Sequence, residues 1–142
     1  MPMLIENRKV YFDYEILEKF EAGLVLVGWE VKSLRNKRGN IAGSHIIIRG
    51  GEAFIVGISI PPYQAKNLPA DFEENSTIKI LLSKKEINYL AGKTHKTGLT
   101  MVPLKLYTKG RKIKMEIALV KGKKKFDKRE TINKREDKRK IE

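Results

Sequence analysis

Regular alternation of apolar and charged residues near residue 113 constrains the fold more than any other feature of this sequence. Ile113, Met115 and Ile117 alternate with lysine and glutamate, which is the two-residue period of a strand with one buried face. Residues 104–108 form another largely apolar run just before a glycine. Residues 104–119 are therefore predicted to form a β-hairpin that turns near Lys109 and Gly110.

A second hairpin is predicted over residues 45–57, "HIIIRGGEAFIVG", where two apolar runs flank Gly50 and Gly51. Both glycines accept the positive φ that a tight turn requires. Several short strands with hairpin turns and few helices favour a mainly β fold. We expect an antiparallel, closed barrel of the oligonucleotide-binding type with two or three flanking helices.

Two helices are predicted between the strands. In "SKKEINYLAGK", Ser83 and Glu86 have the spacing of a capping box, and Gly92 is expected to end the helix. In "WEVKSLRNKRGN", Gly39 is expected to end a shorter helix. Residues 13–28 are ambiguous, because Asp13 suits the start of a helix whereas residues 24–27 favour a strand.

The composition changes sharply after Val120. Residues 121–142 carry many lysines and arginines and almost no large apolar side chains. Such a segment cannot offset its own ordering entropy, so residues 1–120 are expected to be the folded domain and 121–142 a basic tail that is disordered in the free protein. Pairs such as Glu130 and Lys134, four residues apart, allow the tail to become a helix on an anionic partner.

The charge restricts the classes of function. A formal net charge of +13 on 142 residues favours a polyanionic partner, with nucleic acid first. The absence of cysteine excludes disulfides and thiol chemistry. No apolar run approaches the roughly 20 residues needed to cross a bilayer, and no signal peptide is visible, so a soluble, cytoplasmic protein is expected.

Catalytic and metal-binding motifs are not apparent. His45 and His95 have no metal-ligand spacing, and the phosphate-cradling glycine loop with a following lysine is missing. We therefore expect neither an enzyme nor a cofactor, although scattered carboxylates leave a Mg²⁺-dependent nuclease as an alternative. Tyr11, Tyr14 and Trp29 lie among basic residues, where they either stack on bases or fill the core.

Six stretches now point to one family. "NRKVYFDYEI", "EAGLVLVGWEVKSLR", "GEAFIVG", "LLSKKEINYL", "GLTMVPLKLY" and "GKKKFDKRE" resemble, in order and spacing, the small protein B family of SsrA-binding proteins. The resemblance covers residues from about Asn7 to Glu130. It implies a non-enzymatic, monomeric RNA-binding protein. Such a protein binds the tRNA-like domain of transfer-messenger RNA (tmRNA) and delivers it to stalled ribosomes for trans-translation.

The resemblance also carries functional residues onto this chain. The residues it implies to face tmRNA are Asn7, Arg8, Tyr14, Glu21, Ala22, Gly23, Leu81, Ser83, Gly122, Lys123 and Lys124. Phe126, Asp127, Lys128 and Arg129 are implied to contact the ribosomal decoding site, with the tail folding as a helix in the empty mRNA channel. The carboxylate of Glu21 either accepts hydrogen bonds from a base edge or orients a neighbouring basic side chain.

The sequence departs from the family pattern at several places. Phe12 stands where histidine is common, and Ser83 where asparagine or histidine is often found. Residues 70–80 are acidic where the family usually has an arginine-rich loop, so no RNA contact is assigned there. A sequence-tolerant RNA-binding module of the oligonucleotide-binding type remains the alternative function.

Overall fold

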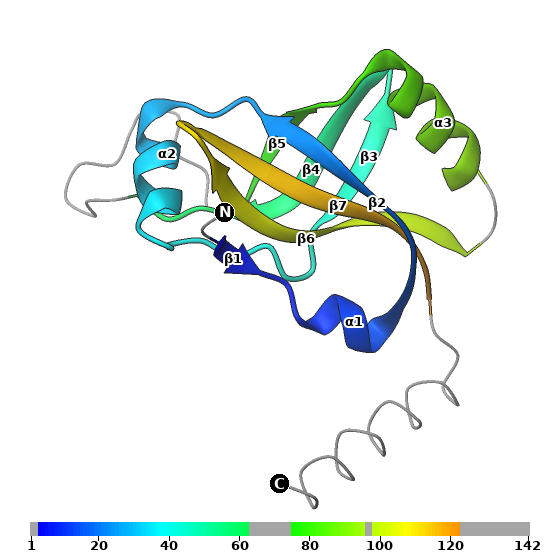
Figure 1. The fold of residues 1–142 in the computed structure, drawn as a ribbon, viewed down its shortest axis with the longest axis horizontal. Coiled ribbons are helices and arrows are strands. Elements are labelled where there is room, and N and C mark those ends of the chain that lie inside the picture. The colour runs from blue at the N-terminus through cyan, green and yellow to red at the C-terminus, as the bar shows by residue number, and fades with distance from the viewer. Residues whose placement is uncertain (1–2, 63–74, 96–97, 123–142) are drawn as a thin grey trace, which may run out of the picture.

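The computed structural model describes residues 3–62, 75–95 and 98–122. In these residues, seven strands form one sheet with the order β1-β6-β3-β4-β5-β2-β7. The strands are β1 (Met3–Glu6), β2 (Tyr14–Leu24), β3 (His45–Arg49), β4 (Glu52–Ser59), β5 (Asn75–Leu81), β6 (Leu99–Lys109) and β7 (Lys112–Gly122). The helices are α1 (Lys9–Asp13), α2 (Gly28–Arg35) and α3 (Lys84–Thr94). Figure 1 shows α2 and α3 at opposite ends of the sheet.

The sheet closes on itself because β7 pairs with β6 as well as with β2. The pairings therefore run in a ring from β6 through β3, β4, β5, β2 and β7 back to β6, with β1 added to β6. All of these pairs are antiparallel, which confirms the prediction of a mainly β, antiparallel fold. Two junctions are short: Ile46 opposite Met101 joins β3 to β6, and two residue pairs join β2 to β5.

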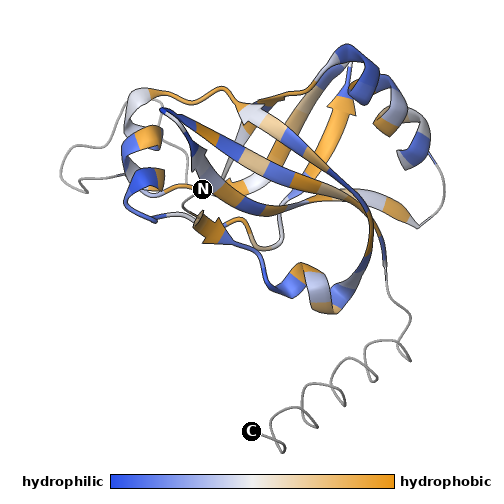
Figure 2. Ribbon diagram, viewed as in Figure 1, coloured by the Kyte–Doolittle hydropathy of each residue, from blue (hydrophilic) through white to orange (hydrophobic). Residues whose placement is uncertain are grey.

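Most of the core lies inside this ring. Ile113, Met115 and Ile117 of β7 are buried there, as the alternation predicts, while the charged residues between them are exposed or half-buried. Figure 2 shows hydrophobic and hydrophilic residues alternating along β2 and β7. The alternation stops at Ala118 and Val120, which are buried in a second cluster beneath Val10 of α1. Because α1 covers the outer face of this end of β7, the strand is apolar on both faces there.

Both predicted hairpins are present. Gly50 and Gly51 form the turn between β3 and β4, with φ values of 61° and 76°. The turn between β6 and β7 consists of Gly110 and Arg111, because Lys109 lies opposite Lys112. It comes one residue later than predicted, and Gly110 supplies the positive φ of 62°.

The capping box at the start of α3 is confirmed. The Glu86 N–H donates to the Ser83 hydroxyl at 3.1 Å, and the Ser83 N–H donates to Glu86 Oε1 at 3.1 Å. The expected end at Gly92 is wrong, because α3 continues to Thr94. The Thr94 hydroxyl donates to the Leu90 carbonyl at 2.9 Å, which satisfies one of the last carbonyl groups.

The expected end of α2 at Gly39 is also wrong, because the helix stops at Arg35. Lys37 takes the left-handed conformation instead, with φ of 58°. Its N–H donates to the Leu34 carbonyl and the Arg38 N–H donates to the Ser33 carbonyl, each at 2.9 Å. This is the pair of bonds of a Schellman motif, here with lysine at the position that glycine usually occupies.

The ambiguous segment 13–28 is mainly a strand, because Tyr14–Leu24 is β2 and Asp13 ends the short helix α1. Sequence reasoning predicted neither α1, β1 nor β5. The expected domain boundary after Val120 falls inside β7, which continues to Gly122.

We predict that Ser83→Ala lowers the free energy of unfolding by about 0.5–2 kcal/mol, because the Glu86 N–H loses its acceptor. Ser83→Asn keeps a side-chain oxygen at the cap and is expected to change the stability little. Urea unfolding of both variants measures the difference. An equal loss of stability in the two variants would show that the side-chain oxygen at residue 83 does not stabilise the helix.

Candidate nucleic-acid interface

Strand β2 contributes to three separate clefts, and these hold most of the described candidate residues. The first, which we call the α1 cleft, measures about 470 Å³ and includes Tyr14. The second, the central cleft, measures about 360 Å³ and includes Glu21. The third, the turn cleft beside the β6–β7 turn, measures about 310 Å³ and includes Gly23 and Leu81. The candidates therefore follow one strand across the surface rather than meeting in one pocket.

The α1 cleft lies where β7 ends. Asn7, Lys9, Tyr14 and His45 all contribute to its lining. Gly122 lies opposite Tyr14 in the β2–β7 pairing, so β7 ends beside this cleft. Figure 1 shows this end of β7 beside α1. The structure thus brings together Asn7, Tyr14 and Gly122, which are far apart in the sequence.

Asn7 is buried and has structural partners. Its side-chain amide donates to the Pro103 carbonyl at 3.1 Å and to the Ile41 carbonyl at 3.5 Å, while its backbone N–H donates to the Leu104 carbonyl at 2.8 Å. These bonds fix the segment between β1 and α1 on β6.

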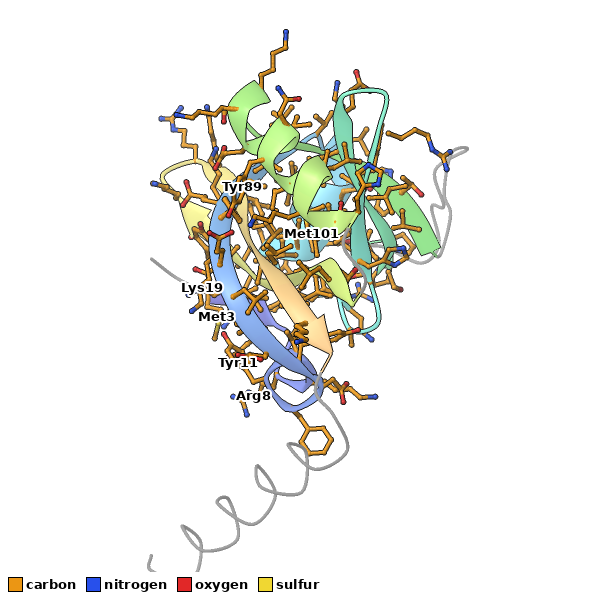
Figure 3. All side chains as sticks on the ribbon, turned by 90° about the vertical axis from the view of Figure 1, so that its right-hand side faces the viewer. Met3, Arg8, Tyr11, Lys19, Tyr89 and Met101 are labelled. Atoms are coloured by element: carbon orange, nitrogen blue, oxygen red, sulfur yellow. The ribbon has the colours of Figure 1, made fainter. Side chains whose placement is uncertain are left out.

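The next residue, Arg8, differs from Asn7 because its side chain is 87% exposed. It forms a surface ion pair with Glu6 at 3.4 Å. Figure 3 shows Arg8 near Tyr11 at this end of the molecule.

Glu21 forms a network in the central cleft. The Tyr107 hydroxyl donates to its carboxylate, and Lys109 Nζ lies 3.1 Å from Glu21 Oε1. The hydrogen bonds from Tyr107 and then from Lys109 hold the pKa of Glu21 below its ordinary value of 4.5. Burial, and then the hydrogen bond to Glu21, raises the pKa of Tyr107. The Glu21 carboxylate therefore favours its ionised form and holds the side chain of Lys109.

Further lysines surround this carboxylate. Lys19 and Lys105 line the central cleft, and Lys105 Nζ lies 5.8 Å from the centroid of the Tyr107 ring. Figure 3 shows Lys19 beside Met3, which is also part of the lining. Lys19 is exposed and Lys105 is half-buried, so Lys19 is the more accessible of the two to a phosphate group, while Glu21 keeps Lys109 in a fixed direction.

Gly23 and Leu81 face each other across the β2–β5 junction in the turn cleft. A Cβ atom at Gly23 would lie 3.3 Å from the Leu81 Cβ, so the absence of a side chain permits this close pairing. Leu81 is 52% exposed, and Ser83 follows it at the exposed start of α3. Ala22 is only 1% exposed, so its side chain belongs to the core and does not reach the surface.

The aromatic candidates differ in exposure. Trp29 and Tyr14 are half-buried and pack against the two core clusters, whereas Tyr11 is exposed. Sequence reasoning missed Tyr89 on α3, whose hydroxyl donates to the Glu18 carboxylate at 2.6 Å. Figure 3 shows Tyr89 beside β2. The partners of Tyr89 and Tyr107 lie on distant parts of the chain, and no local sequence signal marks either ring.

Some expected residues lie outside the described part of the chain: Lys123, Lys124, Phe126, Asp127, Lys128 and Arg129, together with residues 70–74, which include every acidic residue of the segment 70–80. Within residues 3–62, 75–95 and 98–122, no group of three or more histidine, aspartate or glutamate side chains could hold a metal ion. The helices found in those ranges are too short or too polar to span a membrane.

We predict that Tyr107→Phe raises the pKa of Glu21 toward its ordinary value of 4.5, because the strongest hydrogen bond to its carboxylate is lost. Since the folded-state pKa is depressed, this network stabilises the fold above that ordinary value and is lost as the pH falls through the folded pKa. An NMR titration of the glutamate carboxyl carbons measures the shift. Tyr89→Phe, whose hydroxyl contacts Glu18, serves as the control. An unchanged Glu21 pKa in Tyr107→Phe would contradict the assignment.

Comparison with known proteins identifies the family. The sequence model of the SmpB protein family matches residues 4–142. The SsrA-binding protein of Syntrophobacter fumaroxidans is 46% identical over 99% of this chain and 86% of its own length. That of Azoarcus sp. strain BH72 is 51% identical over 94% of this chain and 90% of its own length.

A solved structure agrees with these relatives. It is described as "tmRNA-SmpB: a journey to the center of the bacterial ribosome", and it is 39% identical in sequence. The match covers 93% of this chain and 95% of the solved chain, with a TM-score of 0.72. The likeness in sequence and in fold therefore extends over nearly the whole length of both proteins, and this chain belongs to the SmpB family of SsrA-binding proteins.

Proposed function

We propose that this chain binds the tRNA-like domain of tmRNA and delivers it to stalled ribosomes for trans-translation. The observation that carries the proposal is the likeness to SsrA-binding proteins over nearly the whole chain. The solved neighbour, whose description names tmRNA, SmpB and the bacterial ribosome, supports the same partners. In this proposal the protein is a cytoplasmic, monomeric RNA-binding protein without catalytic activity.

The ring of strands is, in this proposal, a closed barrel of the oligonucleotide-binding type that ends at Gly122. Its described residues have two kinds of role. Arg8, Tyr14, Glu21, Leu81 and Ser83 have exposed or half-exposed side chains at or near the three clefts and contact tmRNA. Asn7, Ala22 and Gly23 support the same surface from below, because their side chains are buried or absent.

The basic tail has a separate role in this proposal. Gly122, Lys123 and Lys124 bind tmRNA at the base of the tail, and residues 126–129 contact the decoding site while the tail folds as a helix in the mRNA channel. The support is the motif "GKKKFDKRE" and the family match that extends to residue 142. A further support is that β7 ends at Gly122, opposite Tyr14 of the α1 cleft.

The first test is selective binding at a salt concentration that suppresses general attraction. At about 200 mM salt, we expect the protein to prefer the tRNA-like domain of tmRNA to an unrelated hairpin of equal length by about a hundredfold or more. Glu21→Ala should reduce this preference, because Lys109 then loses the carboxylate that holds it. Filter binding or fluorescence anisotropy measures both affinities.

Two outcomes would favour the alternatives. Equal and weak binding to both RNAs would mean that the net charge of +13 is the main attraction, as in a sequence-tolerant RNA-binding module. Cleavage of either RNA by the purified protein in the presence of Mg²⁺ would instead indicate a nuclease.

A second prediction separates the ring from the tail. A chain that ends after Gly122 lacks Lys123 and Lys124, so it should bind the tRNA-like domain more weakly but keep most of its selectivity. It should lose ribosomal function, which a tagging assay with purified ribosomes measures. The control is a chain that ends after Val120. It also lacks the pairing of Lys121 and Gly122 with β2, and we expect it to be less stable to urea. Loss of nearly all selectivity in the longer chain would contradict the separation.

A further inference from the structure

The turn cleft has a cationic rim with no carboxylate in its lining. Arg111, Lys112 and Lys114 contribute its charged side chains. Leu24, Val31 and Leu81 contribute apolar surface below them. The central cleft, by contrast, holds Glu21 and Glu116 among its lysines. The turn cleft is thus the most cationic of the three clefts relative to its size, and its volume of about 310 Å³ is at the small end for a ligand pocket.

A contact from α2 fixes the position of this rim. Arg35 Nη2 donates to the carbonyl oxygen of Arg111 at 2.7 Å, between residues 76 positions apart in the sequence. The bond holds the tip of the β6–β7 hairpin beside α2, where Figure 1 shows them close together. The contact restrains the backbone that carries Arg111 and Lys112, although a long exposed arginine loses conformational entropy in forming it.

The turn cleft is also connected electrostatically to the central cleft. Lys114, which lies opposite Gly23 in the β2–β7 pairing, is one of the charges that lower the pKa of Glu21. Glu21 and Gly23 are two residues apart on β2, so they lie about 7 Å apart along the strand. One RNA segment could therefore contact both the Glu21 network and the turn cleft.

We propose that the turn cleft binds an unstacked nucleotide of the RNA, with Arg111 and Lys112 on its backbone phosphates and its base or sugar against Leu81. Arg35 is a positioning residue for this contact. The inference rests on the proposed function and adds residues that the family resemblance does not assign. Nucleotides in loops and bulges can be turned out of a helix, and such nucleotides are what a small, apolar cleft with a cationic rim accepts. Because the rim side chains contact phosphate, which is the same in every nucleotide, the contact increases affinity more than base selectivity.

The test compares two double variants with the same loss of charge. Arg111→Ala/Lys112→Ala removes two of the three rim side chains and leaves Lys114. Arg49→Ala/Lys79→Ala removes one arginine and one lysine that line none of the three clefts. We expect the rim variant to bind the tRNA-like domain at least about tenfold more weakly than the control variant. We also expect the slope of log K against log salt to fall by about 1–2, because two phosphate contacts are lost.

The same measurements on an unrelated hairpin keep this inference separate from the proposed function. If the unaltered protein binds both RNAs equally, the proposed function fails, while the change in salt slope still decides whether Arg111 and Lys112 contact phosphate. If the rim variant and the control variant have the same affinity and slope, the turn cleft does not bind RNA. Circular dichroism and urea unfolding check that the exposed substitutions leave the fold intact.

Arg35→Lys tests the positioning role without removing charge. In the unaltered background we expect it to weaken binding severalfold, because an ammonium group does not reproduce the guanidinium contact with the Arg111 carbonyl. In the Arg111→Ala/Lys112→Ala background it should have no further effect, since the two side chains at the turn that Arg35 positions are gone. The same loss in both backgrounds would show that Arg35 contacts the RNA itself and would overturn the positioning role.

Discussion

Strand β7 is the element on which the rest of the structure depends, because it is hydrogen-bonded along both edges. Its pairing with β2 extends from Tyr14 opposite Gly122 to Gly23 opposite Lys114, and its pairing with β6 covers almost the same length. The other closing junctions are short by comparison. Without β7 the ring would be an open sheet, and β2, which supplies residues to all three clefts, would lack its main partner.

The sequence was sufficient for the parts of the fold that local physics determines. Both hairpins were predictable, because a glycine turn between runs with a two-residue period leaves few alternatives. The α3 cap was predictable for the same reason, since Ser83 and Glu86 satisfy each other's backbone groups without any distant partner. Short elements such as β1 and α1 were missed, because they are stabilised mainly by pairing or packing with β6 and β7, which lie far away in the chain.

The helix ends show how tertiary packing overrides a local signal. Gly39 is not the end of α2, although its position in the sequence favours one. Its φ of 153° favours glycine, and a Cβ atom there would lie 3.1 Å from the side chains of both Ile5 and Leu34. Lys37 takes the left-handed position at the end of α2 instead. Candidate residues behave similarly: the resemblance transferred the position of Ala22, but only the structure shows that its side chain is buried. The resemblance also could not reveal that the hydroxyl of Tyr107, 86 positions away in the sequence, donates to the Glu21 carboxylate.

The route by which the chain leaves the ring has a mechanical consequence. Gly122 is the last residue of a strand whose two neighbours run antiparallel to it, and it emerges beside Tyr14. Tension applied at Gly122 along the axis of β7 therefore loads two rows of hydrogen bonds in shear, rather than peeling them apart one at a time. A pull at this end is distributed over the whole ring, so the folded part of the molecule moves as a unit with whatever holds its C-terminal segment.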